Sequence, residues 1–288
     1  MSYRSVFHPD LFKDHVFIVT GGGSGIGRCT AHELAALGAR VALVGRKAEK
    51  VEAVKAEIIE DGGVASAHVC DIREEESVKA TVKAIIEEHG GLNGVVNNAG
   101  GQFPSPLANI NQKGWETVVR TNLTGGFLIA REAYTRALSK TGGAIVNIVA
   151  DMWGGMPGMG HSGAARAGMV NFTQTAAVEW GCSGVRVNAV APGWIASSGM
   201  DNYPEHMKQW IRSLGDNVPI KRMGTESEVS AAICFLLSPG AAFISGDCLR
   251  IDGAASQGGR VWPFPKAKNN APFNGFHRAV TPKVLSDD

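Results

Sequence analysis

The 288-residue sequence predicts one α/β domain built on a doubly wound parallel sheet, with helices on both faces. Apolar, β-branched runs of strand length alternate with stretches of helix length that carry apolar residues at helical spacing. The short runs lack a strict alternation of apolar and polar residues, which indicates strands that are buried on both faces. The first run leads into a glycine-rich turn that opens a helix pattern. Right-handed crossovers are expected to connect successive strands.

Strands and helices are expected in alternating order along the chain. The expected strands are Val16–Val19, Val41–Val44, Ala65–Val69, Gly94–Asn97, Ala144–Val149, Val185–Val190 and Cys248–Ile251. The expected helices are Arg28–Leu37, Lys47–Glu60, Glu75–Glu88, Trp115–Ser139, Ser162–Trp180 and Glu226–Leu237. Asp71 and Glu74 are expected to form a capping box at the start of the third helix. The acidic run that begins at Glu74 is then the first turn of a helix, and the sequence predicts no metal site.

The composition changes after Ala255. Residues 256–288 are rich in Gly, Pro and Asn, with isolated aromatic residues at Trp262, Phe264, Phe273 and Phe276. A disordered tail would contain fewer aromatic residues. The sequence therefore predicts a domain over residues 1–255 and an irregular C-terminal arm over residues 256–288, anchored on its own or a neighbouring subunit.

Composition and charge exclude several classes of function. Hydrophobic residues make up 44% and charged residues 19% of the chain, as in a globular enzyme with a large core. The net charge of +1 gives no electrostatic reason to expect a nucleic-acid or membrane partner. The five cysteines are scattered and form no C-x-x-C pair, which is typical of reduced thiols. Because neither a secretory signal nor an apolar run of about 20 residues is found, we expect a cytoplasmic protein.

The glycine-rich turn suits the pyrophosphate of a dinucleotide. Glycines let the backbone approach phosphates closely, and a helix N-terminus offers unpaired N–H groups and a partial positive charge. The spacing is Gly-x-x-x-Gly-x-Gly, and such a turn alone could be an ordinary connection between a strand and a helix. The candidate cofactor-binding residues in this turn are Thr20, Gly21, Gly23, Ser24, Gly25, Ile26 and Gly27.

Four further motifs follow the turn in the order found in the short-chain dehydrogenase/reductase family. They are Asp71, Asn97-Asn98-Ala99-Gly100, Asn122 and Pro192-Gly193-Trp194-Ile195. The chain resembles this family from about Leu11 to Ala255, which implies a Rossmann-type sheet and a homotetramer that pairs through the two long helices. The residues that the resemblance implies for the adenine, the nicotinamide ribose and the nicotinamide amide are, in that order, Asp71 and Ile72; Asn98, Ala99 and Gly100; and Pro192, Gly193 and Ile195.

The end of the second expected strand bears on the choice of cofactor. A cofactor with a free ribose 2′-hydroxyl usually meets an acidic residue here. This chain has Gly45 followed by Arg46 and Lys47, two cations that could neutralise a 2′-phosphate. Arg46 is the better candidate because its planar guanidinium forms paired hydrogen bonds with phosphate. The sequence therefore favours NADP(H) over NAD(H), with a basic helix start as the alternative interpretation.

The usual catalytic residues of the resembled family are missing. The family uses a Ser together with a Tyr and a Lys that lie four residues apart on one helix face. Alignment of the segment 165–168 puts Ser162 where the Tyr belongs and Arg166 where the Lys belongs, whereas Asn122 is retained. A Ser hydroxyl is a poor general acid near neutral pH, and Arg166 can hold ribose hydroxyls but cannot relay a proton. Alcohol–carbonyl exchange by the family's usual mechanism is therefore not expected.

These departures resemble another group of enzymes. The segments 97–103, 113–115 and 161–166 are similar to the peroxisomal-type trans-2-enoyl-CoA reductases and, more loosely, to the 2,4-dienoyl-CoA reductases. The resemblance implies that the amide of Gln102 lies near the thioester oxygen of an acyl substrate, where negative charge develops, with Ser162 as a second donor. The proton source stays open between water, His161 and Asp151, although a core histidine and a turn aspartate are the alternative interpretations.

The segment Trp194–Met223 is expected on the substrate side. Its apolar residues match a hinged lid over an apolar acyl chain, and the packing of an ordinary helix is the alternative. These residues are Met200, Tyr203, Met207, Trp210 and Ile211.

Three functions remain open at this point. The first is NADP-dependent reduction of the conjugated double bond of an enoyl thioester, with Gln102, Asn122, Ser162 and Arg166 as catalytic residues. The second is oxidation or reduction of an apolar alcohol or aldehyde, such as an acyclic terpenoid, with an unorthodox acid such as Tyr203. The third is a cofactor-binding protein without turnover.

Overall fold

The structure is a computed structural model that describes residues 2–257, 266–267 and 269–286. Its central sheet has seven parallel strands in the order β3-β2-β1-β4-β5-β6-β9. The strands are β1 (Val16–Thr20), β2 (Arg40–Gly45), β3 (Val64–Val69), β4 (Gly94–Asn97), β5 (Gly143–Ile148), β6 (Val185–Pro192) and β9 (Cys248–Ile251). Every strand expected from the sequence is present, with small differences at the ends.

The strand order makes the sheet doubly wound. β1 pairs with β2 on one side and with β4 on the other, so Val19 lies beside both Leu43 and Val96. The chain therefore leaves β1 and β4 in opposite directions, which opens a crevice at the carboxyl ends of these two strands. The predicted fold class is confirmed.

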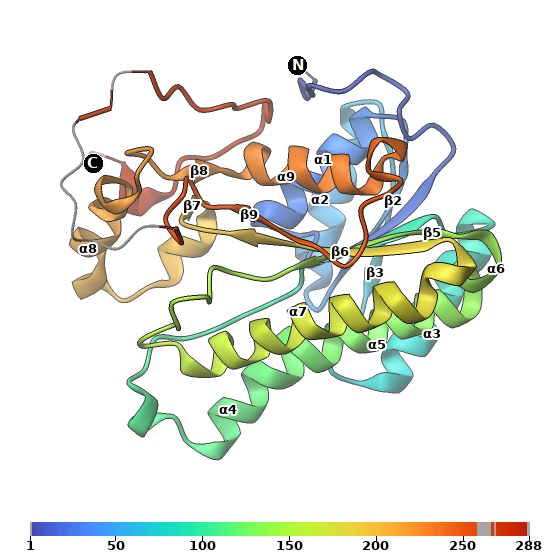
Figure 1. Ribbon diagram of the computed structural model, residues 1–288. Coiled ribbons are helices and arrows are strands. Elements are labelled where there is room, and N and C mark those ends of the chain that lie inside the picture. Colours follow the sequence, from blue (N-terminus) through green and yellow to red (C-terminus); the bar gives the residue numbers. More distant parts are fainter. Residues whose placement is uncertain (1, 258–265, 268, 287–288) are drawn as a thin grey trace.

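Helices cover both faces of the sheet (Figure 1). One layer consists of α1 (Gly25–Ala36), α2 (Ala48–Glu60) and α9 (Glu226–Leu237). The other layer includes α3 (Glu75–His89), α5 (Gly125–Ala133) and α7 (Gly160–Trp180). Alternate residues of β1 enter two different apolar cores, Phe17 and Val19 under the first layer and Val16 and Ile18 under the second. Both faces of this strand are apolar because each one packs against helices.

Two π-helical turns interrupt the long helix expected at Trp115–Ser139. Its parts are α4 (Gln112–Val119), η2 (Arg120–Thr124), α5, η3 (Tyr134–Leu138) and α6 (Ser139–Thr141). Asn122 lies in the first of these turns and is buried. A π-helical turn often marks a functional site, and the apolar periodicity of this stretch did not indicate one.

The capping box expected at Asp71 and Glu74 is wrong. Glu74 is the N-cap residue of α3, and its side chain caps no N–H group. Asp71 instead accepts hydrogen bonds from the backbone and the guanidinium of Arg73, because the paired, charge-assisted contact is stronger than a bond to a helix N–H. A capping box is present at the start of α9, where Thr225 and Glu228 each accept the other's backbone N–H.

The C-terminal arm is anchored on its own subunit. Phe276 packs against Tyr3, and Arg278 forms ion pairs with Glu60 and Asp61 at the end of α2. Hydrogen bonds from Arg278 help to lower the pKa of Asp61 to about 2, so the Asp61 carboxylate stays charged. Of the aromatic residues expected to anchor the arm, Phe273 and Phe276 are described, whereas Trp262 and Phe264 lie outside the described residues.

Short elements make up the segment expected to cover the substrate, residues 194–223, here called the lid segment. They are β7 (Ile195–Ala196), η5 (Ser198–Asn202), η6 (Glu205–Met207), α8 (Lys208–Arg212) and η7 (Leu214–Asn217), and β7 pairs with β8 (Gly224–Thr225). The arm holds the lid segment from outside through η9 (Lys283–Leu285). The backbone N–H of Val284 donates to Asp201, and the guanidinium of Arg212 donates to the Val284 carbonyl. Further short turns are η1 (Leu107–Asn109), η4 (Gly181–Ser183) and η8 (Pro239–Ala241).

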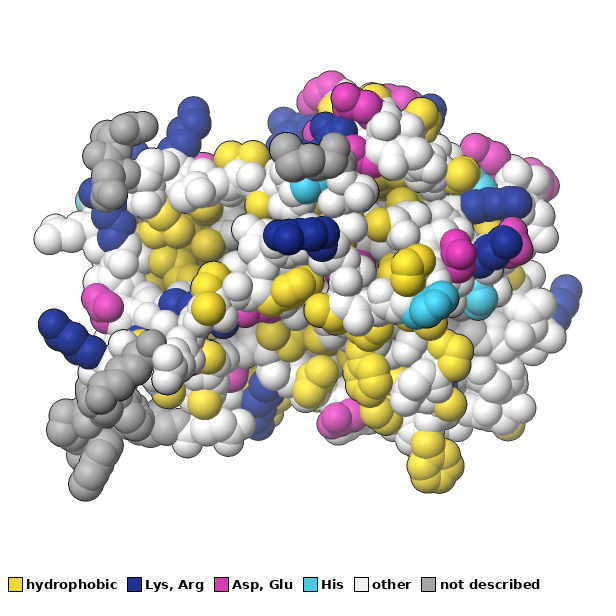
Figure 2. Space-filling view, turned by 90° about the horizontal axis from the view of Figure 1, so that it is seen from above, with side chains coloured by type: hydrophobic (Ala, Val, Ile, Leu, Met, Phe, Trp, Pro, Cys, Tyr) yellow, Lys and Arg dark blue, Asp and Glu magenta, His cyan; other side chains and the backbone are white. Residues whose placement is uncertain are grey.

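The surface carries charges of both signs. On the face shown in Figure 2, Lys and Arg side chains are interspersed with Asp and Glu side chains. Among the described residues, no helix has both the length and the apolar character that a membrane crossing needs. All five cysteines are free thiols, and three of them are buried.

Candidate active site

The glycine turn between β1 and α1 leaves no room for side chains. A Cβ atom at Gly21, where φ is +66°, would lie 2.8 Å from the Asn98 amide nitrogen. A Cβ atom at Gly27 would lie 2.5 Å from the Gly21 carbonyl oxygen. Ser24 is the N-cap residue of α1, but its side chain caps no N–H group. The first-turn N–H groups are therefore open to an anionic ligand.

Hydrogen bonds fix the end of β4 against the end of β1. The Thr20 hydroxyl accepts the backbone N–H groups of Asn98 and Ala99 at 3.0 and 2.9 Å. The Asn98 amide nitrogen donates to the Thr20 carbonyl oxygen at 2.9 Å. Thr20 is buried, so it positions the backbone at the crevice and does not line it.

A cavity of about 190 Å³, here called the smaller cavity, lies at the carboxyl ends of β1 to β4. The predicted cofactor-binding residues that line it are Gly21, Ser24, Arg46, Asp71, Ile72, Asn98, Ala99 and Gly100. Arg73 also lines it, and its hydrogen bonds lower the pKa of Asp71 to about 2. No sequence pattern pointed to Arg73. Lys47, the N-cap residue of α2, does not line the smaller cavity.

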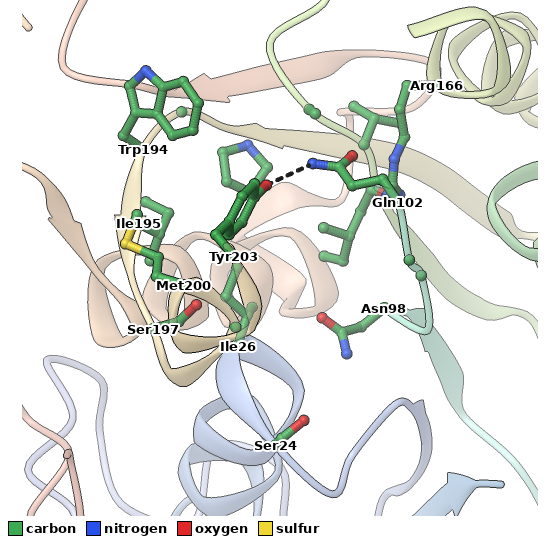
Figure 3. A pocket seen from close by; sticks show the side chains of 18 of the residues that line it. Ser24, Ile26, Asn98, Gln102, Arg166, Trp194, Ile195, Ser197, Met200 and Tyr203 are labelled. Atoms are coloured by element: carbon green, nitrogen blue, oxygen red, sulfur yellow. Dashed lines mark hydrogen bonds between the residues drawn. The ribbon is translucent and has the colours of Figure 1, made fainter. Parts of the chain in front are cut away.

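A larger cavity of about 540 Å³ adjoins the smaller one, and Ser24, Asn98 and Gly100 line both. The other predicted cofactor-binding residues that line it are Ile26, Arg166, Pro192, Gly193 and Ile195. Figure 3 shows Gln102 and Tyr203 extending toward each other, with Ile195 and Met200 close to Tyr203. The two cavities together form one cleft along the crevice of the sheet.

Gln102 links two hydroxyl groups. Its amide nitrogen donates to the Tyr203 hydroxyl at 3.5 Å, and its amide oxygen accepts from the Ser162 hydroxyl at 2.6 Å. Because the oxygen of the amide is held by Ser162, the N–H groups are directed toward the larger cavity. Ser162 itself is fully buried and does not line this cavity. The structure thus places Ser162 behind Gln102, where its hydroxyl orients the Gln102 amide.

His161 and Asp151 do not line the larger cavity either. His161 is fully buried, its Nδ1 accepts the Ser162 backbone N–H at 2.8 Å, and its ring packs edge-on against Phe103. Asp151 accepts the backbone N–H of Trp153, and burial raises the pKa of the Asp151 carboxyl. His161 therefore lies in the core and Asp151 in a turn, as the alternative interpretations of these residues proposed. Neither residue is placed to deliver a proton to a substrate in the larger cavity.

Asn122 fixes the loop that carries Gln102, and the Arg166 guanidinium lies beside Gly100 at the start of this loop. One terminal nitrogen of Arg166 donates to the Ile148 carbonyl at 2.6 Å, whereas its Nε is buried with no hydrogen-bond partner in the described part of the chain. Burial lowers the pKa of Arg166 to about 10, so it remains charged at neutral pH. Asn122 bonds the backbone N–H and carbonyl of Gly101 at 2.9 and 2.8 Å. Asn122 therefore fixes the loop and lies behind the cavity wall.

The lid segment divides between lining the cavity and packing on itself. The residues that line the larger cavity include Trp194, Met200 and Tyr203. These three residues also belong to or pack against an apolar cluster that contains Ile211 together with Val284 of the arm, and Met207 packs against it as well. Trp210 packs edge-on against Trp194. Met200 and Tyr203 thus face the larger cavity, as expected for a cover over a substrate. Met207, Trp210 and Ile211 pack against other parts of the protein, as expected for an ordinary helix.

Glu226 is a further acid beside the glycine turn, and no sequence pattern pointed to it. A Cβ atom at Gly25 would lie 3.8 Å from its carboxylate. Burial raises the pKa of Glu226 from 4.5 to about 7.

Glu226→Gln is expected to stabilise the protein at about pH 8. Because the pKa of Glu226 is raised in the folded state, its protonated form favours folding below about pH 4.5, and this contribution is lost as the pH rises to about 7. The variant should gain about 1–3 kcal/mol in the free energy of unfolding above pH 7, after allowance for partial solvent screening. Urea denaturation at about pH 4.5 and at about pH 8 measures this gain in the free energy of unfolding. Glu49→Gln on the surface of α2 is the control. An equal difference between variant and wild type at both pH values would contradict it.

A family model described as enoyl-(acyl carrier protein) reductase matches residues 21–256. The chain belongs to the short-chain dehydrogenase/reductase family. It is therefore an oxidoreductase, and members of this family use NAD(P)(H).

Three relatives illustrate the range of the family. The structure of a citronellol catabolism dehydrogenase of Pseudomonas aeruginosa PAO1 is similar with a TM-score of 0.80 and 66% identity, over 88% of this chain and 100% of that chain. An actinorhodin polyketide ketoreductase structure with NADPH has a TM-score of 0.81 and 30% identity, over 87% of this chain and 100% of that one. A peroxisomal 2,4-dienoyl-CoA reductase of Danio rerio is 33% identical over 257 residues, 88% of this chain and 85% of the relative.

The cleft of this short-chain dehydrogenase/reductase fits a nicotinamide dinucleotide. The glycine turn packs too tightly for a Cβ atom at Gly21 or Gly27, and its helix offers open N–H groups to a pyrophosphate. The Nε of Arg166 is a buried donor without a partner among the described residues, as a residue that holds ribose hydroxyls would be. Arg46 and Arg73 line the cavity at the other end of the cleft.

Arg46→Ala is expected to weaken NADPH binding selectively. Charge-assisted bonds from Arg46 to a 2′-phosphate would contribute about 1.5–3 kcal/mol, which is about one to two decades in Kd. Titration of NADPH and NADH into both proteins measures the loss, with Lys47→Ala as the matched control. Equal losses for the two cofactors, or none, would remove Arg46 from this role.

Proposed function

We propose that the protein is an NADP(H)-dependent dehydrogenase for the alcohol or aldehyde group of an apolar, acyclic terpenoid. The observation that carries this proposal is the 66% identity to a citronellol catabolism dehydrogenase over 88% of the chain. The dienoyl-CoA reductase shares only 33%. Oxidation or reduction of an apolar alcohol or aldehyde, the second of the three functions considered from the sequence, is therefore preferred to enoyl reduction.

The lining of the larger cavity supports an apolar substrate. Ile148, Val149, Trp194, Ile195 and Met200 contribute apolar surface to it. Gln102 and Tyr203 place an amide and a hydroxyl among these apolar groups. An apolar cavity with a few placed polar groups suits a hydrocarbon chain that carries one oxygen.

In this proposal Tyr203 provides the acid–base group that α7 lacks. The nicotinamide, when bound, supplies a hydride to the carbonyl carbon or takes one from the carbinol carbon. In the reducing direction the Tyr203 hydroxyl gives its proton to the carbonyl oxygen, and in the oxidising direction the deprotonated Tyr203 accepts the alcohol proton. The Gln102 amide donates a hydrogen bond to the oxygen on which negative charge develops.

Reduction of an enoyl thioester is the second candidate. The absence of the family's Tyr and Lys from α7 is the observation that favours it. Ser162 and Arg166 occupy the positions of the family's Tyr and Lys, so no phenol of α7 reaches the cleft. Hydride transfer to a conjugated double bond needs a hydrogen-bond donor at the thioester oxygen, and the Gln102 amide can fill this role.

A substrate panel distinguishes these functions. We expect NADP⁺ reduction with citronellol and similar acyclic alcohols, and a kcat/KM at least about tenfold above that for NADPH oxidation with decenoyl-CoA or crotonyl-CoA. Each reaction is also measured with NAD(H). Activity with the thioesters alone would establish the second candidate. NADPH binding with neither activity would indicate a cofactor-binding protein without turnover.

We also propose a homotetramer that pairs through the long helices α4–α5 and α7. Ala164 and Ala167 are small and exposed on α7, which permits close packing of a second helix. Light scattering should give four times the chain mass of 30.3 kDa. A monomeric mass would contradict this assembly.

A further inference from the structure

A cluster of metal-binding side chains lies at the edge of the sheet, away from the cleft. We propose that His68, Glu88 and His89 bind one divalent cation of the zinc type. His68 is on the edge strand β3, and the other two residues end α3, whose last residue, His89, contacts Ser66 of β3. None of the three lines the smaller or the larger cavity. This site would therefore be separate from the proposed catalytic chemistry.

The ligand atoms already converge. One nitrogen of each imidazole and one oxygen of the carboxylate lie within 4.8 Å of one another. His68 Nε2 is 3.6 Å from Glu88 Oε2. Neighbouring ligands on a tetrahedral zinc are about 3.4 Å apart, given metal–ligand distances of about 2.0–2.1 Å. Small side-chain rotations would complete three ligand positions and leave a fourth for water.

Ser66 holds the two imidazole rings in this arrangement. Its hydroxyl is within 2.8 Å of Nε2 of both His68 and His89. Ser66 is buried two residues before His68 on the same face of β3. Because one hydroxyl carries a single proton, it cannot donate to both rings at once. A cation bound by both Nε2 atoms would replace these two hydrogen bonds with two metal bonds.

Charges of both signs surround the two imidazoles. Lys55 and Arg40 are neighbouring cations. Those two cations oppose a divalent ion, whereas the carboxylates of Glu88 and Glu52 attract one. Two imidazole nitrogens and a half-exposed carboxylate form a borderline N/O donor set, which suits zinc better than calcium or magnesium.

Zinc titration of the chelator-treated full-length protein tests the proposal. We expect one equivalent bound, a higher melting temperature with ZnCl₂, and a Co²⁺ absorption spectrum of tetrahedral type. His68→Ala, His89→Ala and Glu88→Gln should each weaken zinc binding at least about tenfold, because even residues that only support a ligand act on this scale. Circular dichroism and NADPH affinity should not change in these variants.

Two controls separate this site from adventitious binding. His206→Ala removes an exposed histidine of the lid segment, and Cys182→Ser removes an exposed thiol; neither should alter the zinc affinity. The proposal is overturned if the affinity is the same in wild type and in the His68→Ala/His89→Ala double variant. Loss of zinc binding in either control, with the cluster intact, would also overturn it.

Discussion

Tyr203→Phe is expected to lower kcat for oxidation of an acyclic terpenoid alcohol by about 10²–10⁴-fold, the usual contribution of a positioned general acid or base. The substitution keeps the ring in the wall of the larger cavity and against the apolar cluster of the lid segment. It removes only the hydroxyl that meets the Gln102 amide. Cofactor affinity and melting temperature should therefore stay close to those of wild type. Steady-state kinetics with citronellol and NADP⁺ measure the loss.

Tyr134→Phe is the matched control. The Tyr134 hydroxyl bonds Ser183, and its ring stacks on Trp180 outside the two cavities. This variant should keep its kcat. If Tyr203→Phe oxidises the alcohol at the wild-type rate, Tyr203 is not the acid–base group.

Gln102→Ala is expected to lower kcat by about 10²–10³-fold, the scale of losing one hydrogen-bond donor to a developing oxyanion. The loss should occur in either proposed reaction, because both place negative charge on a substrate oxygen near this amide. NADPH affinity should be nearly unchanged. Gln102→Glu should be similarly slow, since a carboxylate can accept from Tyr203 and Ser162 but cannot donate.

The exposed Gln112 on α4, whose amide bonds Glu116, provides the control variant Gln112→Ala. Ser162→Ala should cause a smaller loss than Gln102→Ala, because it removes the bond that orients the amide but leaves the amide in place. Full activity in Gln102→Ala would refute the role of this residue in both reactions.

The central strands of the sheet were predictable because they pack on both faces. Such strands must be apolar throughout, so runs such as Val16–Val19 stand out in the sequence. The capping box at Asp71 failed for a local reason, since the nearby Arg73 offers the carboxylate a better partner than the helix does. A residue pattern shows which bonds are available, and only the fold decides between competing partners.

The candidate site was predicted in part. The glycine turn follows β1 and Arg46 follows β2. These two strands are parallel neighbours, so the residues after them meet at one edge of the sheet and line one cavity. The contacts of Gln102 join residues 60 and 101 positions away, and no local pattern specifies them. Alignment gave the position of Ser162 but not the direction of its hydroxyl. The missing Tyr on α7 argued against the usual mechanism, and Tyr203, named from the sequence as an alternative acid on the substrate side, lines the larger cavity.

The contact of the C-terminal arm with the lid segment has a consequence for folding during synthesis on the ribosome. The bond between Val284 and Asp201 joins residues 83 positions apart. At a synthesis rate of about 5–20 residues per second, the partner follows about 4–17 s after the segment it secures. During these seconds Met200 and Ile211, which share an apolar cluster with Val284 in the folded protein, lack this contact on the nascent chain. This stretch is therefore where we expect chaperones to engage the growing polypeptide.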